Sequence, residues 1–224
     1  MRGRILSTGE VYHIFTRSIA NFKIFKKEKD FLRIIDMMAF YQRKNKVSFA
    51  VFEKNKSKIL VENNNRNNNK IVKIIAYCIM PTHIHLILKQ LEEKGISVFM
   101  SNLLNSYTRY FNLRHKRKGP LWESRFKRIH IENDEVLLHL TRYIHLNPVT
   151  AYLVEDPIEW KYSSYREYLL QLPPEKCICE YKDLLEINPI SYKRFVEDRA
   201  SYQRELAKIR HLIADDENQF NLRG

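Results

Sequence analysis

The stretch that decides the fold runs from Ile71 to Leu88 and reads IVKIIAYCI, then MPT, then HIHLIL. Its first part is a strongly apolar run, which is typical of a buried strand. Pro81 and Thr82 then turn the chain into a second apolar strand. Residues i and i+2 of a strand point to the same face, so His83 and His85 lie on one face. The stretch predicts two paired strands and two imidazoles that can converge on one metal ion.

Apolar spacing and turn signals predict the elements on either side. We expect strands over Val11–Ile19, Val47–Glu53 and Arg128–Ile131, and helices over Lys27–Asn45, Gly95–Arg114 and from Asn133 or Asp134 to about Leu146. The last helix should end there because the residue before a proline disfavours the α region. This order predicts an α+β fold: a ferredoxin-like antiparallel sheet with helices packed on it.

The chain divides most naturally at residue 157. Residues 1–157 contain the predicted sheet, and residues 158–224 are more polar and form a mostly helical C-terminal extension. The helical stretches that we expect there are Trp160–Leu170, Tyr192–Asp198 and Tyr202–Asp215.

The composition favours an acidic polymer as partner. The 224 residues include 39 lysines and arginines against 26 acids, a net charge of +13, which favours nucleic acid first and an anionic membrane second. A basic protein without such a partner is the alternative. Three cysteines fit a reducing compartment. Because no apolar run approaches the ~18 residues of a membrane span and no secretory signal is present, we expect a cytoplasmic protein without a membrane partner, associated with the nucleoid.

The last predicted helix of the sheet domain carries a line of polar residues. His139, Tyr143 and Asn147 follow one another at i+4 spacing. The expected core stripe beside them consists of Val136, Leu137, Leu140 and Ile144. If the sheet margin there carries the two histidines, Asn147 completes a set of three metal ligands and Tyr143 stands beside it. The alternative for Tyr143 is an ordinary aromatic at the core edge.

A basic cluster extends from Arg109 to Arg128. This segment contains eight lysines and arginines and a single acid, Glu123. Interleaved aromatic residues would stack on unpaired bases while the cations bind phosphates. The alternative to DNA binding is a solvated helix end followed by aromatic side chains that are buried in the core and anchor the segment. We expect this anchor role for Trp122 and Phe126. The candidate DNA-binding residues are Arg109, Arg114, Lys116, Arg117, Lys118, Arg125, Lys127 and Arg128.

Five motifs in order along the chain resemble those of one family. They are Tyr12-His13-Ile14, the Met80–Leu86 segment, Gly119–Lys127 (GPLWESRFK), Arg142–Val149 (RYIHLNPV) and Trp160–Tyr165 (WKYSSY). The pattern resembles the REP-associated tyrosine transposases, which belong to the IS200-like, single-tyrosine HUH transposases. The resemblance extends from about Gly9 to Leu170 and implies the HUH nuclease fold for residues 1–157.

The resemblance also implies roles for individual residues. The HUH histidines fall on His83 and His85, the nucleophile on Tyr143 and the third metal-binding group on Asn147. Insertion-sequence relatives typically have glutamine at this last position, so the asparagine points to the REP-associated branch. The rival nucleophiles are Tyr107 and Tyr110, neither of which precedes the Asn-Pro-Val element.

The implied activity is cleavage and strand transfer of single-stranded, hairpin-forming DNA through a 5′-phosphotyrosine, by a monomer or a homodimer. Mg²⁺ or Mn²⁺ is the expected cofactor, and Mn²⁺ should serve at least as well because imidazole suits softer ions. About one free tyrosine in a thousand is ionised at pH 7, so a base must take the proton; metal-bound water and His139 are both candidates. A domesticated protein that binds hairpins without cutting them is the alternative from another class.

Overall fold

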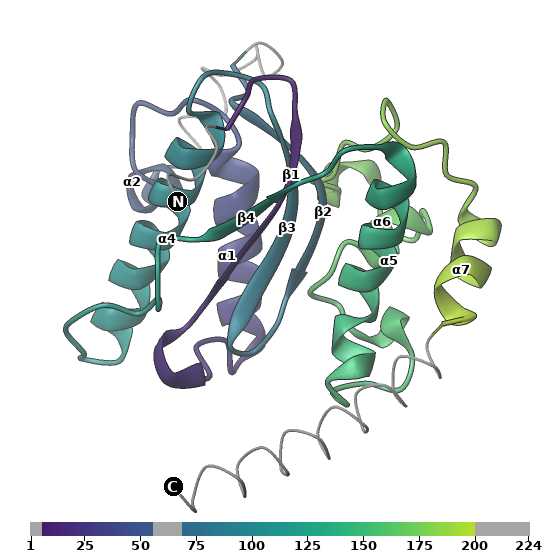
Figure 1. Ribbon diagram of the computed structural model, residues 1–224. Coiled ribbons are helices and arrows are strands. Elements are labelled where there is room, and N and C mark those ends of the chain that lie inside the picture. The colour runs from purple at the N-terminus through teal and green to yellow at the C-terminus, as the bar shows by residue number, and fades with distance from the viewer. Residues whose placement is uncertain (1–5, 56–68, 200–224) are drawn as a thin grey trace, which may run out of the picture.

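The computed structural model describes residues 6–55 and 69–199 of the chain. At its centre is a four-stranded antiparallel sheet with helices on both faces (Figure 1). The strands are β1 (Val11–Arg17), β2 (Val72–Ile79), β3 (His83–Gln90) and β4 (Lys127–His130), in the spatial order β2-β3-β1-β4. The predicted α+β fold with an antiparallel sheet is confirmed.

One face of the sheet packs against the two long helices that connect its strands. They are α1 (Glu28–Tyr41) and α4 (Gly95–Arg114), seen on one side of the sheet in Figure 1. The predicted bounds of α4 are confirmed, and its apolar stripe is buried, Phe99 and Tyr107 completely. Helix α4 begins so close to the sheet that a Cβ on Gly95 would collide with the Ile71 carbonyl, which explains the glycine.

The opposite face is covered by α5 (Asp134–Thr150), with α6 (Tyr165–Tyr168) and α7 (Pro189–Glu197) beside it (Figure 1). The segment after residue 157 joins this second core. The Trp160 indole donates to the Ile79 carbonyl at 3.1 Å, and the Tyr168 hydroxyl donates to the Ile75 carbonyl at 2.9 Å. The extension therefore packs on β2, an edge strand of the sheet. The division at residue 157 stays a prediction, and Tyr202–Asp215 lies outside the described residues.

The predicted strand at Val47–Glu53 is wrong. The structure has helix α2 there, from Phe49 to Lys54. The Ser48 hydroxyl caps it by accepting from the Val51 amide, and Phe49 and Phe52 both pack on Phe40. Two aromatic side chains three residues apart meet the same neighbour only in a helix, so tertiary packing overrides the alternation of the sequence.

The predicted end of α5 near Leu146 is also wrong, because the helix continues through Pro148 to Thr150. The proline has no backbone N–H to donate. The helical hydrogen bonds nevertheless continue after it, because the Ala151 amide donates to the Asn147 carbonyl at 2.9 Å. Pro148 is itself buried. A proline in a last turn costs one hydrogen bond and is tolerated where packing compensates for it.

The remaining elements are short. They are the 3-10 turns η1 (Ile19–Asn21), η2 (Pro157–Glu159) and η3 (Pro174–Lys176). Among the helices of the described ranges, none combines the length and the apolar character that crossing a membrane requires.

Candidate active site

The candidate site lies on the sheet face that α5 covers, where β1 ends and β3 begins. Directly opposite residues of an antiparallel pair point to the same face. The register of β1 and β3 places Arg17 opposite His83 and Phe15 opposite His85. Cys78 of β2 is the other neighbour of His85 and belongs to the core beneath α5. The predicted common face of the two histidines is therefore the α5 face.

Burial keeps both histidines neutral. It lowers the pKa of His83 to about 4 and that of His85 to about 2, and nearby positive groups add to the effect. Each ring has its Nδ1 engaged: that of His83 lies 2.8 Å from Thr82 Oγ1, and that of His85 lies 3.1 Å from His13 Nε2. Nε2 is then the nitrogen that each ring can offer to a cation, and neutral imidazole is the form that binds metals.

Tyr143 stands on α5 beside this pair. Its ring centroid lies 6.0 Å from that of His85, with the ring planes at 87°. The side chain is 41 % exposed, although Ile144 next to it is fully buried. Tyr143 thus lies at the margin between helix and sheet, as the i+4 pattern predicts. An exposed tyrosine beside two neutral imidazoles is a candidate nucleophile.

The buried face of α5 differs from the predicted stripe. Leu137 and Ile144 are buried, but Val136 is 46 % exposed. The polar Thr141 and His145 are completely buried instead. A count of apolar residues misses them because buried polar groups become acceptable once they are hydrogen-bonded.

Asn147 lies one helical turn after Tyr143 and is half-buried. Its Nδ2 donates to the Tyr143 carbonyl at 3.0 Å, which holds the amide along the helix. Within residues 6–55 and 69–199, no three histidine, cysteine or acidic side chains gather closely enough to hold a metal ion. Asn147 is the amide of α5 that the sequence proposes as a third ligand beside the two histidines.

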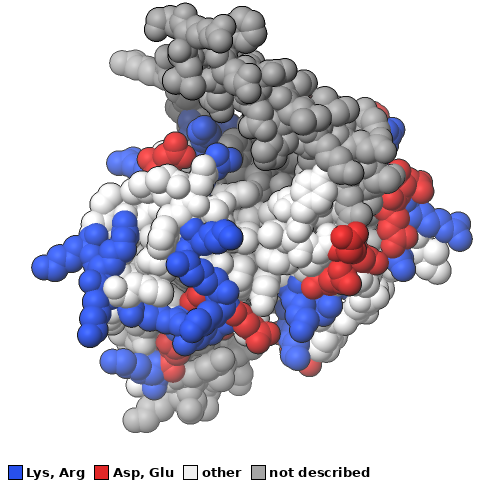
Figure 2. Space-filling model, turned by 90° about the horizontal axis from the view of Figure 1, so that it is seen from below, with Lys and Arg blue, Asp and Glu red and all other residues white. Residues whose placement is uncertain are grey.

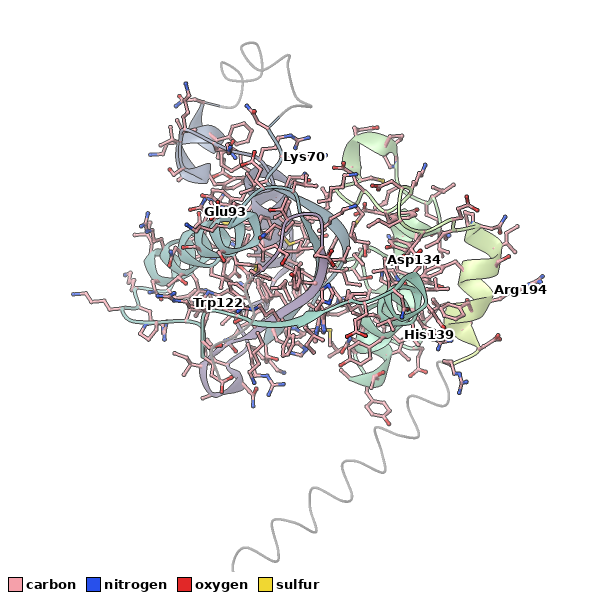
Figure 3. The ribbon with its side chains drawn as sticks, turned by 45° about the horizontal axis from the view of Figure 1, so that its top comes forward. Lys70, Glu93, Trp122, Asp134, His139 and Arg194 are labelled. Carbon is pink, nitrogen blue, oxygen red and sulfur yellow. The ribbon has the colours of Figure 1, made fainter. Side chains whose placement is uncertain are left out.

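His139 lies one turn before Tyr143 and is labelled in Figure 3. Its Nδ1 lies 2.8 Å from Arg142 Nη2, and its ring lies 5.4 Å from that of Phe195 in α7. A guanidinium only donates, so Nδ1 is the acceptor and the neutral ring carries its proton on Nε2. A shallow surface groove along α5 is lined by Glu135, Val136, His139, Leu140 and Tyr143.

Two residues of β1 belong to this site, although the sequence assigns them no role. His13 is 6 % exposed and hydrogen-bonds His85. Arg17 is exposed, opposite His83, and its charge acts on both histidines of β3. The available signal was the i, i+2, i+4 spacing of His13, Phe15 and Arg17, which puts all three on one face of a strand.

The hydroxyls of the two rival nucleophiles, Tyr107 and Tyr110, are hydrogen-bonded to other groups of the fold. Tyr107 is completely buried, its hydroxyl donates to the Ile24 carbonyl at 3.0 Å, and burial raises its pKa. The Tyr110 hydroxyl accepts from Arg114 Nη1 at 2.7 Å. Both side chains stabilise α4 against its neighbours.

The predicted DNA-binding residues fall into two groups. Arg114 Nη1 lies 2.6 Å from the buried carboxylate of Asp30, and Arg117 bonds Asn112 Oδ1 and the Pro120 carbonyl. These two arginines stabilise local structure. The other six are exposed: Arg109, Lys116, Lys118, Arg125, Lys127 and Arg128. Figure 2 shows basic side chains gathered over much of one half of the lower end of the molecule.

The aromatic residues of this segment are anchors, as expected. The Trp122 indole, labelled in Figure 3, donates to the Leu104 carbonyl at 3.2 Å and packs near Phe25. Phe126 is partly buried against the same core. They attach the segment before β4 to α4 and leave the neighbouring cations at the surface.

Comparisons with known proteins find relatives of this chain. A putative REP-associated tyrosine transposase of Haemophilus influenzae is 30 % identical over 112 residues, which are 45 % of this chain and 64 % of the relative. A solved structure of a REP-associated tyrosine transposase bound to a REP hairpin has a TM-score of 0.51 at 16 % identity. The likeness covers 84 % of this chain and 98 % of the solved one, and it shows a shared fold.

The family model described as "Transposase IS200 like" matches residues 36–147, which are half of the 224 residues. The matched segment contains the two histidines of β3 and also Tyr143 and Asn147, whereas His13 and Arg17 lie before it. The chain therefore belongs to the IS200-like transposase family.

Proposed function

We propose that this protein is a metal-dependent endonuclease and strand transferase that acts on single-stranded, hairpin-forming DNA through a 5′-phosphotyrosine. One observation carries the proposal: the exposed Tyr143 ring lies 6.0 Å from the buried His85 ring. Family membership supports the chemistry, and the solved relative bound to a REP hairpin supports the DNA class.

The residues present fit a divalent cation. His83 and His85 are neutral imidazoles on one face, with Nε2 as the donor atom, and the Asn147 amide oxygen would be the third donor. These three donors bring no negative charge. Mg²⁺ or Mn²⁺ held there would keep its full charge and polarise the scissile phosphate.

Tyr143 would supply the nucleophile. Its hydroxyl oxygen attacks phosphorus, an O–P bond forms and the bond from phosphorus to the 3′-oxygen breaks. The tyrosine proton goes to a base, the 3′-oxygen takes up a proton, and the 5′-phosphate stays on the tyrosine. The phosphodiester energy is kept in that ester, so attack by a 3′-hydroxyl rejoins the strand without a nucleotide cofactor.

The cations around the histidines would hold the DNA backbone. Arg17 is opposite His83, and Lys127 of β4 is opposite Phe15, so both basic residues are on the site face. Neighbouring strands are about 4.8 Å apart, which keeps both cations within reach of a phosphate at the histidine pair. The exposed lysines and arginines nearer α4 would bind further phosphates along the DNA strand.

His139 would act as a hydrogen-bond donor and not as the base that takes the proton of Tyr143. Its Nδ1 lone pair accepts from Arg142, which leaves an N–H on Nε2. Loss of a general base typically costs 10²- to 10⁴-fold in rate. We expect His139→Gln, which retains a donor, to lower the single-turnover cleavage rate by less than about tenfold, and a loss in the range for a base would contradict this role.

The test separates cutting from binding. Labelled hairpin oligonucleotides from the DNA around the gene are incubated with the full chain, with Mn²⁺, Mg²⁺ or chelator. We expect cleavage with both metals, at least as fast with Mn²⁺, and none with chelator or with Tyr143→Phe. Gel-shift affinity for the hairpin should stay unchanged in Tyr143→Phe.

A binding protein that no longer cuts DNA is the second candidate. It would bind the hairpin with equal affinity in all these conditions and yield no cleavage with either metal. The retained nucleophile and histidines favour the nuclease, because hairpin binding alone does not require this combination.

A further inference from the structure

We propose that His13 is a positioning residue that accepts a hydrogen bond from His85 Nδ1–H and so fixes the tautomer in which His85 Nε2 can bind a divalent cation. This role rests on the proposed function. It adds a residue of β1, outside the segment that the family model matches, to the chemistry of the site.

The geometry is that of a hydrogen bond between ring edges. His13 Nε2 and His85 Nδ1 are 3.1 Å apart, and the two ring planes differ by 17°. The ring centroids are 5.3 Å apart, well beyond the distance between the nitrogens, so the rings meet edge to edge. The donor and the acceptor are both buried, at 6 % and 8 % exposure.

Only one proton can occupy this bond. If it lies on His13 Nε2, His85 accepts with Nδ1, and its own proton is on Nε2, where it blocks a metal. If it lies on His85 Nδ1, the lone pair of Nε2 is available. The metal-binding form of His85 therefore needs an acceptor beside Nδ1, and His13 is that neighbour. Thr82 has the equivalent place beside His83 Nδ1, at 2.8 Å.

Two other roles for His13 fit less well. A third metal ligand would direct a ring nitrogen at the cation, but His13 Nε2 is directed at the far nitrogen of His85. A purely packing role would need the ring and not its nitrogen. The contact with Phe15, at 5.0 Å between centroids, would serve that role. Both can be tested, because glutamine keeps an acceptor without the ring and phenylalanine keeps a ring without the acceptor.

The first experiment locates the proton. In the metal-free full chain with ¹⁵N-labelled histidine, we expect NMR to find the proton on His85 Nδ1. Scalar coupling across the hydrogen bond should join it to His13 Nε2. A proton on His13 Nε2, or the absence of coupling in a folded sample, would overturn the proposal. This readout does not depend on activity, so it decides the matter even if the proposed nuclease function fails.

The second experiment measures Mn²⁺ affinity by electron paramagnetic resonance. Loss of a second-shell partner typically weakens metal binding 10- to 100-fold. We expect that loss in His13→Phe and an affinity closer to wild type in His13→Gln, with hairpin affinity in chelator unchanged in both. Equal Mn²⁺ affinity in all three proteins would contradict the proposal and leave His13 with a packing role only. An equal loss of affinity in both variants would also contradict it and indicate that His13 is itself a metal ligand. Thermal unfolding checks that the variants are folded.

Discussion

Arg17 and His83 occupy opposite positions of the β1–β3 ladder, at the end of the sheet that Tyr143 adjoins. Burial is the main cause of the lowered pKa of both His83 and His85, and the positive charge of Arg17 adds to it. In the proposed function, a phosphate at the histidine pair would be within reach of this guanidinium. Charge would develop on that phosphate during attack by Tyr143, and a fixed donor beside it would stabilise the transition state more than the ground state.

Arg17→Gln should therefore slow cleavage about 100-fold, the usual cost of removing one such donor. Hairpin affinity should fall much less, because a single phosphate contact is lost among many. Single-turnover cleavage and gel shifts measure the two effects, and Arg17→Lys, which keeps the charge, is the matched control. An equal loss of rate and affinity would make Arg17 an ordinary DNA contact.

These residues also show what a sequence can predict about a site. The pair His83 and His85, and the pair Tyr143 and Asn147, each share one element, so the period of a strand or helix gives their relation. His13 and Arg17 join the site through strand register, which pairs residues about seventy positions apart. No local pattern encodes that register, so the sequence alone could not place either residue beside His83 and His85.

Helix α5 positions Tyr143 through a buried polar network. His145 on α5 is completely buried, with Nδ1 2.7 Å from the Tyr192 hydroxyl of α7 and Nε2 2.8 Å from Ser164 Oγ. Ser164 Oγ in turn accepts from the Tyr77 amide of β2 at 2.9 Å. The network joins α5, α7 and the sheet. Because the network buries polar residues of α5, the face of the helix that packs on the sheet differs from the predicted apolar stripe.

Burial lowers the pKa of His145 to about 3, below the value near 6.5 of an unfolded histidine. Above pH 6.5 the ring is neutral in both states and its contribution to stability is complete. As the pH falls from 6.5 toward 3, only the unfolded chain takes up the proton, so stability is lost.

We expect His145→Gln to be less stable than wild type at pH 7 but to lose about 2 kcal/mol less between pH 7 and pH 5. Urea unfolding at both pH values measures the difference. His115→Gln, at an exposed histidine, is the control for the substitution itself. The same pH dependence in His145→Gln and wild type would show that His145 is not held neutral in the fold.

The excess positive charge of the chain has two uses. Arg114 links α4 to α1 through Asp30, which is 3 % exposed. Lys127 and Arg125 are exposed around the edge strand β4. The sequence could predict that this cluster is basic but not which cations are paired internally, because Asp30 lies 84 residues before Arg114.

The two groups should respond oppositely to substitution. Arg114→Gln leaves the buried Asp30 carboxylate with the Lys26 and Lys27 amides but without its cation. It should lower the free energy of unfolding, with hairpin affinity nearly unchanged. Lys127→Gln should leave stability unchanged, weaken binding to all hairpins alike and reduce the salt dependence of log K by about one. Chemical unfolding and gel shifts at several salt concentrations measure both. A Lys127→Gln protein with the wild-type salt dependence would place the DNA elsewhere.

The most direct measurement maps the covalent bond. The full chain is incubated with a hairpin oligonucleotide and Mn²⁺, denatured and digested, and the modified peptide is sequenced by mass spectrometry. The proposed function predicts a 5′-phosphonucleotide on Tyr143, a released fragment with a free 3′-hydroxyl, and no adduct with Tyr143→Phe. An adduct on Tyr107, Tyr110 or any other residue, or cleavage without an adduct, would contradict it.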